Sequence, residues 1–179
     1  TSTIVAGESD IQVECNCAGV SPGVTYTARE LLDGLLLASG NDAANTLARM
    51  LGGQDAAISK MNAKAAALGA GATTVGSPSG IDGPGITMWS SAHDLAVIFR
   101  SAMRYPEFAQ ITAQPTALFP TKSGNKVLVN QDEMLGRYPG MLGGKTGYTD
   151  LARKTFVGAA ERGTVRRDAV WGAARWVVV

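Results

Sequence analysis

Residues 30–48 read ELLDGLLLASGNDAANTLA, and this stretch decides the fold. Thr27 and Glu30 form a T-x-x-E pattern, which is typical of a helix start because each side chain can bind the other residue's backbone N–H. The leucines that follow cover most of the helix circumference, so we expect a buried helix. Ser39–Asn41 (SGN) interrupts it, and apolar residues at helical spacing then resume. The sequence therefore predicts two apolar helices joined by a short polar turn.

Helices are expected in the first part of the chain and strands in the second, which favours an α+β fold with helices packed on an antiparallel sheet. One further helix would place Ile58, Met61, Ala65 and Leu68 on a shared face and end at Gly69, and another would begin with a capping box of Ser91 and Asp94. The remaining segments are an extended stretch near 3–13, a Gly-rich and Pro-rich loop at 76–85, and strands at 126–130, 143–149 and 155–160. We expect a single domain over residues 1–179.

The composition is that of a globular protein, with 45% hydrophobic and 17% charged residues. A net charge of +1 without basic runs argues against a nucleic-acid partner. The apolar stretches fall far short of the roughly 20 residues that a membrane span needs. Residues 1–9 lack the pattern of a secretory signal.

The chain offers few of the soft side chains that bind zinc. Cys15 and Cys17 are its only cysteines and His93 its only histidine, too few soft ligands for a closed zinc site. A disulfide across Cys-x-Cys would close a strained ring in an extended segment, so we expect two thiols. His93 lies off the apolar stripe of its helix, and we expect it at the surface. No metal and no cofactor are predicted.

Two short motifs carry the candidate chemistry. Ser39–Asn41 lies at a helix break, and Lys145–Gly147 (KTG) lies on an expected strand after two glycines. A serine hydroxyl both accepts and donates a proton, and an asparagine side chain can hold an amide. A lysine ammonium with a threonine hydroxyl suits a carboxylate, and a glycine allows a ligand to approach the strand. Together they resemble a site for acyl transfer to or from a peptide.

With these motifs, residues 11–162 resemble the serine-type D-Ala-D-Ala carboxypeptidases, the low-molecular-mass penicillin-binding proteins of peptidase family S11. The segments around SGN, SPSGIDGPG at 77–85 and NQDEMLGRYPGMLGGKTGYTDLARKTFVGAAER at 130–162 all share the resemblance. It implies a β-lactamase/transpeptidase-like fold and removal of the terminal D-Ala of peptidoglycan stem peptides through an acyl-serine intermediate. It also implies catalytic roles for Ser39 and Asn41, substrate binding by Lys145, Thr146 and Gly147, and an extracytoplasmic location in the periplasm or cell wall.

The sequence departs from the family at both ends. In the family, the S-x-x-K motif that carries the nucleophile lies several tens of residues before the SGN serine. Ser39 is too near Thr1 to leave room for this motif. We therefore expect a domain that is incomplete at the N-terminus. Whether this chain is active by itself stays open, and β-lactam antibiotics are expected to inhibit it only if a nucleophile is supplied. Residues 123–126 (SGNK) match S-x-x-K formally, but we interpret them as a polar turn. Residues 164–179 are predicted to be a divergent tail.

Two alternatives stay open at this point, and a third fails on its spacing. The first is a catalytically dead, muropeptide-binding pseudoenzyme that keeps Lys145 and Thr146. The second is a class A β-lactamase, for which Glu107 is the first candidate for the deacylating glutamate, although its surroundings suggest the continuation of a helix. The third takes PGMLGGKTG at 139–147 as a phosphate-binding loop, but the first glycine of that motif falls on Pro139.

Overall fold

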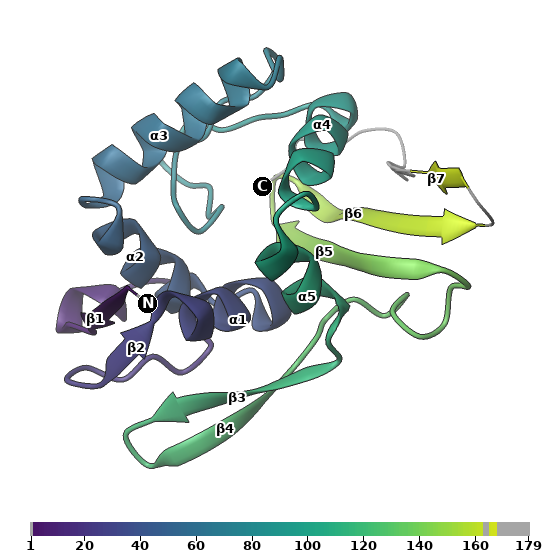
Figure 1. Ribbon diagram of the computed structural model, residues 1–179. Helices are drawn as coiled ribbons and strands as arrows, with labels where there is room; N and C mark the ends of the chain where they lie inside the picture. The colour runs from purple at the N-terminus through teal and green to yellow at the C-terminus, as the bar shows by residue number, and fades with distance from the viewer. Residues whose placement is uncertain (1, 163–164, 168–179) are drawn as a thin grey trace.

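Helix α1 (Ala28–Ala38) lies at the centre of the fold (Figure 1). The computed structural model describes residues 2–162 and 165–167. Around α1 pack α2 (Asn41–Met50), α5 (Pro106–Ala113) and the hairpin of β3 (Thr116–Thr121) and β4 (Gly124–Val129). The central position explains why the leucine-rich stretch has so few polar side chains.

The predicted capping box starts α1. Thr27 Oγ1 accepts the N–H of Glu30 at 3.2 Å, and Glu30 Oε2 accepts the N–H of Thr27 at 2.7 Å. At its other end, Ser39 is a left-handed C-cap residue with φ 56° and ψ 40°, and Gly40 is the N-cap of α2. The predicted break between two helices is therefore confirmed.

The hydrophobic core joins the first helix pair to the β3–β4 hairpin. Tyr26 of β2 (Thr25–Thr27) stacks on Phe119 of β3 with ring centroids 5.2 Å apart, and its hydroxyl donates to Pro120 O at 3.0 Å. The buried members of this core are Ala6, Ala18, Val20, Tyr26, Leu31, Leu36, Leu37, Ala43, Ile111, Phe119 and Leu128. Contacts over such long sequence separations fix the hairpin against α1.

The strands form antiparallel ladders. β1 (Thr3–Val5) pairs with β2, β3 with β4, and β5 (Met141–Thr149) with β6 (Arg153–Arg162), which also pairs with β7 (Val165–Arg167). Helix α5 packs on β5, and α4 (Ala92–Ala102) packs on β6. The α+β prediction and the three predicted strands are confirmed. Apart from 165–167, the predicted tail at 164–179 lies outside the described residues.

Three parts of the chain differ from the prediction. The expected extended stretch at 3–13 is only the short strand β1 followed by a 3-10 helix, η1 (Glu8–Asp10). Strand β3 contains Pro120, a residue that usually argues against a strand, yet here it pairs with Asn125 in a two-stranded hairpin where one ladder side is free. Helix α5 begins afresh at Pro106 instead of continuing α4, because proline suits the first helical turn.

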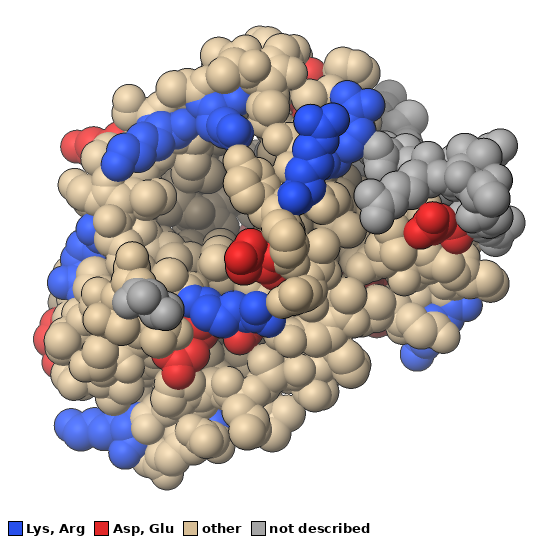
Figure 2. All heavy atoms as spheres, in the orientation of Figure 1, with Lys and Arg blue, Asp and Glu red and all other residues tan. Residues whose placement is uncertain are grey.

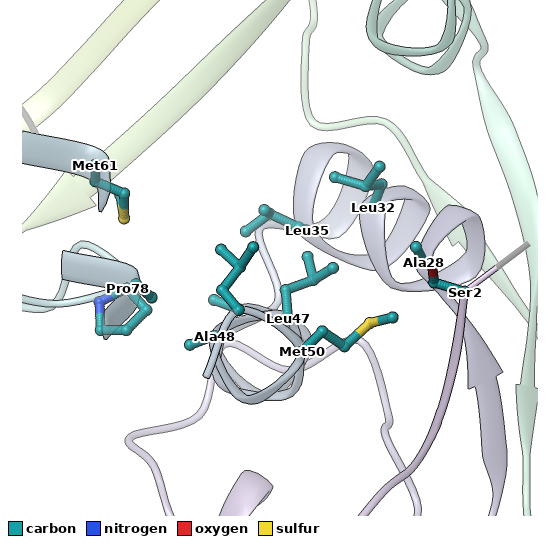
Figure 3. A pocket seen from close by; sticks show the side chains of 12 residues that line it. Ser2, Ala28, Leu32, Leu35, Leu47, Ala48, Met50, Met61 and Pro78 are labelled. Atoms are coloured by element: carbon teal, nitrogen blue, oxygen red, sulfur yellow. The ribbon is translucent and has the colours of Figure 1, made fainter. Parts of the chain in front are cut away.

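Helix α3 (Gln54–Ala67) is less buried than its predicted face suggested. Ala65 is buried, but Met61 is 38% exposed. The helix packs on α2, and an apolar groove of about 480 Å³ opens beside these helices (Figure 3). We call it the α1–α3 groove; it is lined by Ser2, Ala28, Leu32, Leu35, Ala44, Leu47, Ala48, Met50, Leu51, Ala57, Met61 and Pro78. Leu32 and Leu35 therefore line this groove as well as packing against the core.

The second predicted capping box is half correct. Ser91 Oγ accepts the N–H of Asp94 at 3.1 Å, but the Asp94 carboxylate accepts Ala72 N–H at 2.7 Å and Thr73 Oγ1 at 2.9 Å instead. Asp94 thus ties the preceding loop to the start of α4. His93 is exposed, as predicted, with its ring beside Asp94.

Basic side chains lie along α3 and beside α4, with acidic side chains scattered over the same face (Figure 2). The surface is hollowed beside α2 and α3 in this view. Among residues 2–162 and 165–167, no helix combines the length and the apolar composition that crossing a membrane requires.

Candidate active site

The two sequence motifs meet in space. Lys145 Nζ on β5 donates a hydrogen bond to Ser39 Oγ at the end of α1, at 2.9 Å and across 106 residues of sequence. The same ammonium donates to Thr146 O at 2.5 Å. The structure therefore brings the predicted serine and lysine into direct contact.

The Lys145 side chain is mostly removed from water. Because burial disfavours the charged form, it lowers the pKa of Lys145 from its usual 10.5 to about 8. The ammonium still predominates at neutral pH. A buried cation of this kind is a binding point for an anion, since little water competes for it.

Thr146 and Gly147 continue along β5 from the lysine. Within the described residues β5 is an edge strand, because β6 is its one ladder partner there. An edge strand presents backbone N–H and C=O groups that can pair with an extended peptide. Gly143, two residues before Lys145, has φ 146° and leaves no room for a side chain, since a Cβ there would lie 2.5 Å from Thr112 Oγ1 of α5. The glycines before KTG thus allow α5 to pack closely on the strand.

Asn41 bonds to the loop that precedes the helices. Its side chain is buried, its Nδ2 donates to Glu14 O at 2.7 Å, and its backbone N–H donates to Asn16 O at 2.7 Å. The predicted roles of Asn41 toward a substrate amide or a lysine stay predictions. Residues 14–20 lie beside Asn41, and we call them the clamp loop.

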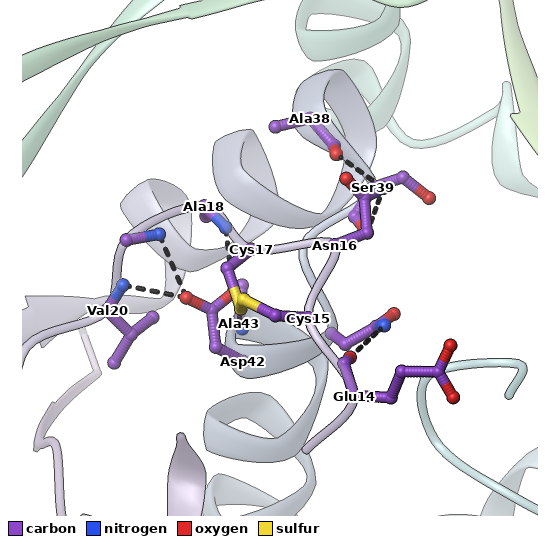
Figure 4. The surroundings of a disulfide bond; sticks show 12 residues. Glu14, Cys15, Asn16, Cys17, Ala18, Val20, Ala38, Ser39, Asp42 and Ala43 are labelled. Carbon is purple, nitrogen blue, oxygen red and sulfur yellow. Dashed lines mark hydrogen bonds between the residues drawn. A yellow bond between two sulfur atoms is a disulfide. The ribbon is translucent and has the colours of Figure 1, made fainter. Parts of the chain in front are cut away.

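The prediction that Cys15 and Cys17 remain thiols is wrong. They form a disulfide within the clamp loop (Figure 4). The prediction assumed an extended strand, but no strand spans these residues, and their Cα atoms are 5.0 Å apart, within the range that disulfides use.

Two residues of the site were not identified in the sequence. Asn16 Nδ2 lies 3.1 Å from both Ala38 O and Ser39 O and donates to them. Gln131 Nε2 donates to Ala38 O at 3.1 Å, and Gln131 Oε1 accepts from Thr146 Oγ1 at 3.4 Å. The last carbonyl groups of a helix lack partners within the helix and need donors from elsewhere. The amide side chains of Asn16 and Gln131 can supply such donors, and this was the signal that could have identified the two residues.

The loop at 76–85 borders the end of β5. Thr149 Oγ1 donates to Asp82 Oδ2 at 2.5 Å and accepts the N–H of Ala152 at 2.9 Å. Inside the loop, Ser77 Oγ donates to Ile81 O at 2.9 Å. The loop is thereby tied to the strand that carries Lys145.

The remaining candidates lie elsewhere. Ser123 is exposed in the turn between β3 and β4, as predicted, and Lys126 Nζ donates to Ala18 O at 3.0 Å. The phosphate-loop alternative is wrong, because Lys145 and Thr146 lie inside a strand and not at a helix N-terminus. Glu107 is exposed in the first turn of α5.

Comparison with known proteins identifies relatives of this chain. Residues 6–174 match the family model of peptidase S11, described as D-alanyl-D-alanine carboxypeptidase. The chain is 68% identical over 162 residues to D-alanyl-D-alanine carboxypeptidase DacB2 of Mycobacterium tuberculosis, covering 90% of this chain and 56% of that protein. It is 33% identical to D-alanyl-D-alanine carboxypeptidase DacF of Bacillus subtilis, covering 84% of this chain and 39% of that protein. The chain thus spans about half the length, or less, of these relatives.

Solved structures show the same likeness. A D-alanyl-D-alanine carboxypeptidase from Mycobacterium tuberculosis superposes with a TM-score of 0.88 at 67% identity, over 91% of this chain and 62% of that one. The Streptomyces K15 DD-transpeptidase superposes with a TM-score of 0.82 at 30% identity, over 90% of this chain and 68% of that one. The fold is therefore that of the penicillin-binding peptidases, and the chain belongs to the D-alanyl-D-alanine carboxypeptidase family, peptidase S11.

Proposed function

We propose that this chain forms the substrate-carboxylate wall of a serine-type D-Ala-D-Ala carboxypeptidase that acts on peptidoglycan stem peptides outside the cytoplasmic membrane. The observation that carries the proposal is the partly buried Lys145 ammonium, which lies on the edge strand β5 and 2.9 Å from Ser39 Oγ. A cation, a hydroxyl that can relay a proton and an open peptide edge are what cleavage of a terminal D-Ala requires.

Each of these groups has a proposed role in the reaction. The C-terminal carboxylate of the peptide binds the Lys145 ammonium and the Thr146 hydroxyl, and the peptide backbone pairs with β5 near Gly147. Ser39 Oγ already accepts a hydrogen bond from Lys145, so its own proton is free to pass to the departing D-Ala amine. The proton that the attacking serine loses on forming the acyl bond would then replace it on Ser39, so Lys145 stays charged and keeps the carboxylate.

The acyl-serine intermediate also needs a nucleophile, which the family carries at the start of a buried helix. Such a helix requires an apolar surface to pack on. The α1–α3 groove offers one, since Leu32, Leu35 and Leu47 line it. We propose that the groove holds this helix in family members and so brings the nucleophile toward Ser39. The 44% of DacB2 beyond the 56% that this chain covers leaves ample length for it.

Carboxylate binding is expected to weaken as pH rises through about 8. Lys145 is charged below this pKa and neutral above it, so the ammonium fraction falls about tenfold between pH 7 and pH 9. Affinity for an N-acetylated peptide ending in D-Ala-D-Ala should fall by about the same factor, as measured by isothermal titration calorimetry.

The same peptide with a C-terminal amide is the matched control, because it lacks the carboxylate and should bind weakly at every pH. The Lys145→Met variant should bind the acid as weakly as the amide, whereas Lys154→Met, which alters an exposed lysine on the neighbouring strand, should bind like the original chain. Acid and amide peptides with equal affinities would refute the carboxylate wall.

Labelled penicillin distinguishes catalysis from binding alone. We expect the 179-residue chain to form no covalent adduct in intact-mass spectrometry, because its single S-x-x-K, at 123–126, lies on an exposed turn where Lys126 is hydrogen-bonded to carbonyl groups. An adduct mapped to Ser39 or Ser123 would overturn this assignment. Peptide binding without an adduct would leave the second candidate, a muropeptide-binding role, for this chain.

A further inference from the structure

The clamp loop contacts the Ser39 turn from both sides. Asn16 donates its side-chain N–H groups to Ala38 O and Ser39 O, while its backbone carbonyl accepts the N–H of Asn41. One residue thus bonds the last carbonyls of α1 and the first N–H of α2. No other residue of the clamp loop reaches both helices at the turn in this way.

The turn depends on such support. Ser39 has φ 56°, a left-handed conformation that residues other than glycine adopt only when their surroundings hold them there. The carbonyls of Ala38 and Ser39 lie past the regular hydrogen bonding of α1 and need external donors. Asn16 supplies donors to both, so its position bears on where Ser39 Oγ meets Lys145.

The disulfide joins the two residues on either side of Asn16. Cys15 and Cys17 flank it directly, and their bond closes a ring that contains the Asn16 backbone. Figure 4 shows the bond beside Asp42, with Asn16 reaching from the loop toward Ala38 and Ser39. Cys15 is exposed, so a reductant in solution can reach its sulfur.

We infer that Asn16 is a positioning residue for Ser39, and that the Cys15–Cys17 disulfide is a redox-sensitive clamp that holds it in place. The release step is thiol–disulfide exchange with an external dithiol. One thiolate of the reductant attacks Sγ of Cys15 and expels the Cys17 thiolate, and the second displaces Cys15. The reductant leaves as a cyclic disulfide, two electrons pass to the protein, and two protons complete the cysteine thiols.

The test follows the Ser39 turn in the full chain without any substrate, so its outcome does not depend on the proposed function. Only the importance of Ser39 rests on that function. Dithiothreitol reduces the chain, a thiol count verifies reduction, and NMR records two quantities. The first is hydrogen exchange at the Asn41 amide, which bonds to Asn16 O. The second is the titration midpoint of the Lys145 side chain, which reports the surroundings of its Nζ beside Ser39.

Reduction should speed Asn41 exchange about tenfold and shift the Lys145 midpoint, and reoxidation should reverse both changes. Asn16→Asp should reproduce them with the disulfide intact. The matched control is Asn62→Asp, because Asn62 Nδ2 also donates to two carbonyls, Ile58 O at 3.1 Å and Val75 O at 2.9 Å, far from the turn. It should leave the Lys145 midpoint unchanged.

Two results would overturn the inference. If the fully reduced chain keeps both the exchange rate and the midpoint of the oxidised chain, the disulfide is not a clamp. If Asn16→Asp shifts the Lys145 midpoint no more than Asn62→Asp does, Asn16 is a structural residue without a positioning role.

Discussion

The Asp42→Ala variant is expected to lose about 3–5 kcal/mol of stability. The Asp42 carboxylate is 1% exposed and accepts the backbone N–H groups of Ala18, Gly19 and Val20 at 2.8–2.9 Å. Hydrogen bonds to a charged group contribute about 1.5–3 kcal/mol each, and the variant leaves buried donors without partners. Since three such bonds do not add fully, the expected loss is smaller than their simple sum.

Thermal unfolding followed by circular dichroism measures this effect, which should lower Tm by about 10 °C for a chain of this size. Asp55→Ala is the matched control, because Asp55 lies in the first turn of α3 as Asp42 does in α2 but is exposed. Both variants lose the same interaction with a helix dipole, and only Asp42→Ala releases the clamp loop. Equal Tm values for the two variants would show that the loop contributes nothing to stability.

The Gly40→Ala variant should cost about 2–3 kcal/mol, mainly through steric overlap. A Cβ on Gly40 would lie 2.8 Å from the Cβ and from the backbone nitrogen of Ala18, and 2.8 Å from Asp42 Oδ1. Overpacking of this kind costs about 1–3 kcal/mol, and here the displaced atoms also share a hydrogen bond. The same thermal unfolding experiment applies.

Gly71→Ala separates overlap from the general effect of replacing a glycine. A Cβ added at Gly71 would meet no atoms within 4 Å, and the residue has no positive φ, so alanine there should leave Tm unchanged or raise it slightly. A Gly40→Ala variant as stable as Gly71→Ala would mean that Ala18 can move aside freely and that the clamp loop is not held at this point.

Local signals were sufficient for the central helix α1. The Thr27 and Glu30 pair and the apolar run after it predicted α1, its start and its burial, because capping and periodicity act within a few residues. That Ser39 and Lys145 belong to one site was predicted through the resemblance of two motifs and not through any local rule, since 106 residues separate them. Their direct hydrogen bond was not predicted.

Other features depend on long-range partners that a sequence does not display. Asn16, Gln131 and Asp42 are ordinary polar residues until the structure places helix ends and loop N–H groups beside them. The Cys15–Cys17 disulfide was missed because the assumed backbone was extended. Strand β3 was missed because Pro120 breaks the usual strand pattern, which a two-stranded hairpin tolerates.

Because of the disulfide beside the Ser39 turn, the chemical state of a sample depends on the compartment in which the protein was produced. Disulfides persist in oxidising compartments and are reduced in the cytosol of most bacteria. A chain recovered from a reducing cytosol and one recovered after secretion therefore share a sequence but differ by two hydrogen atoms at Cys15 and Cys17. Binding measurements from the two preparations are comparable only once the thiols have been counted in each.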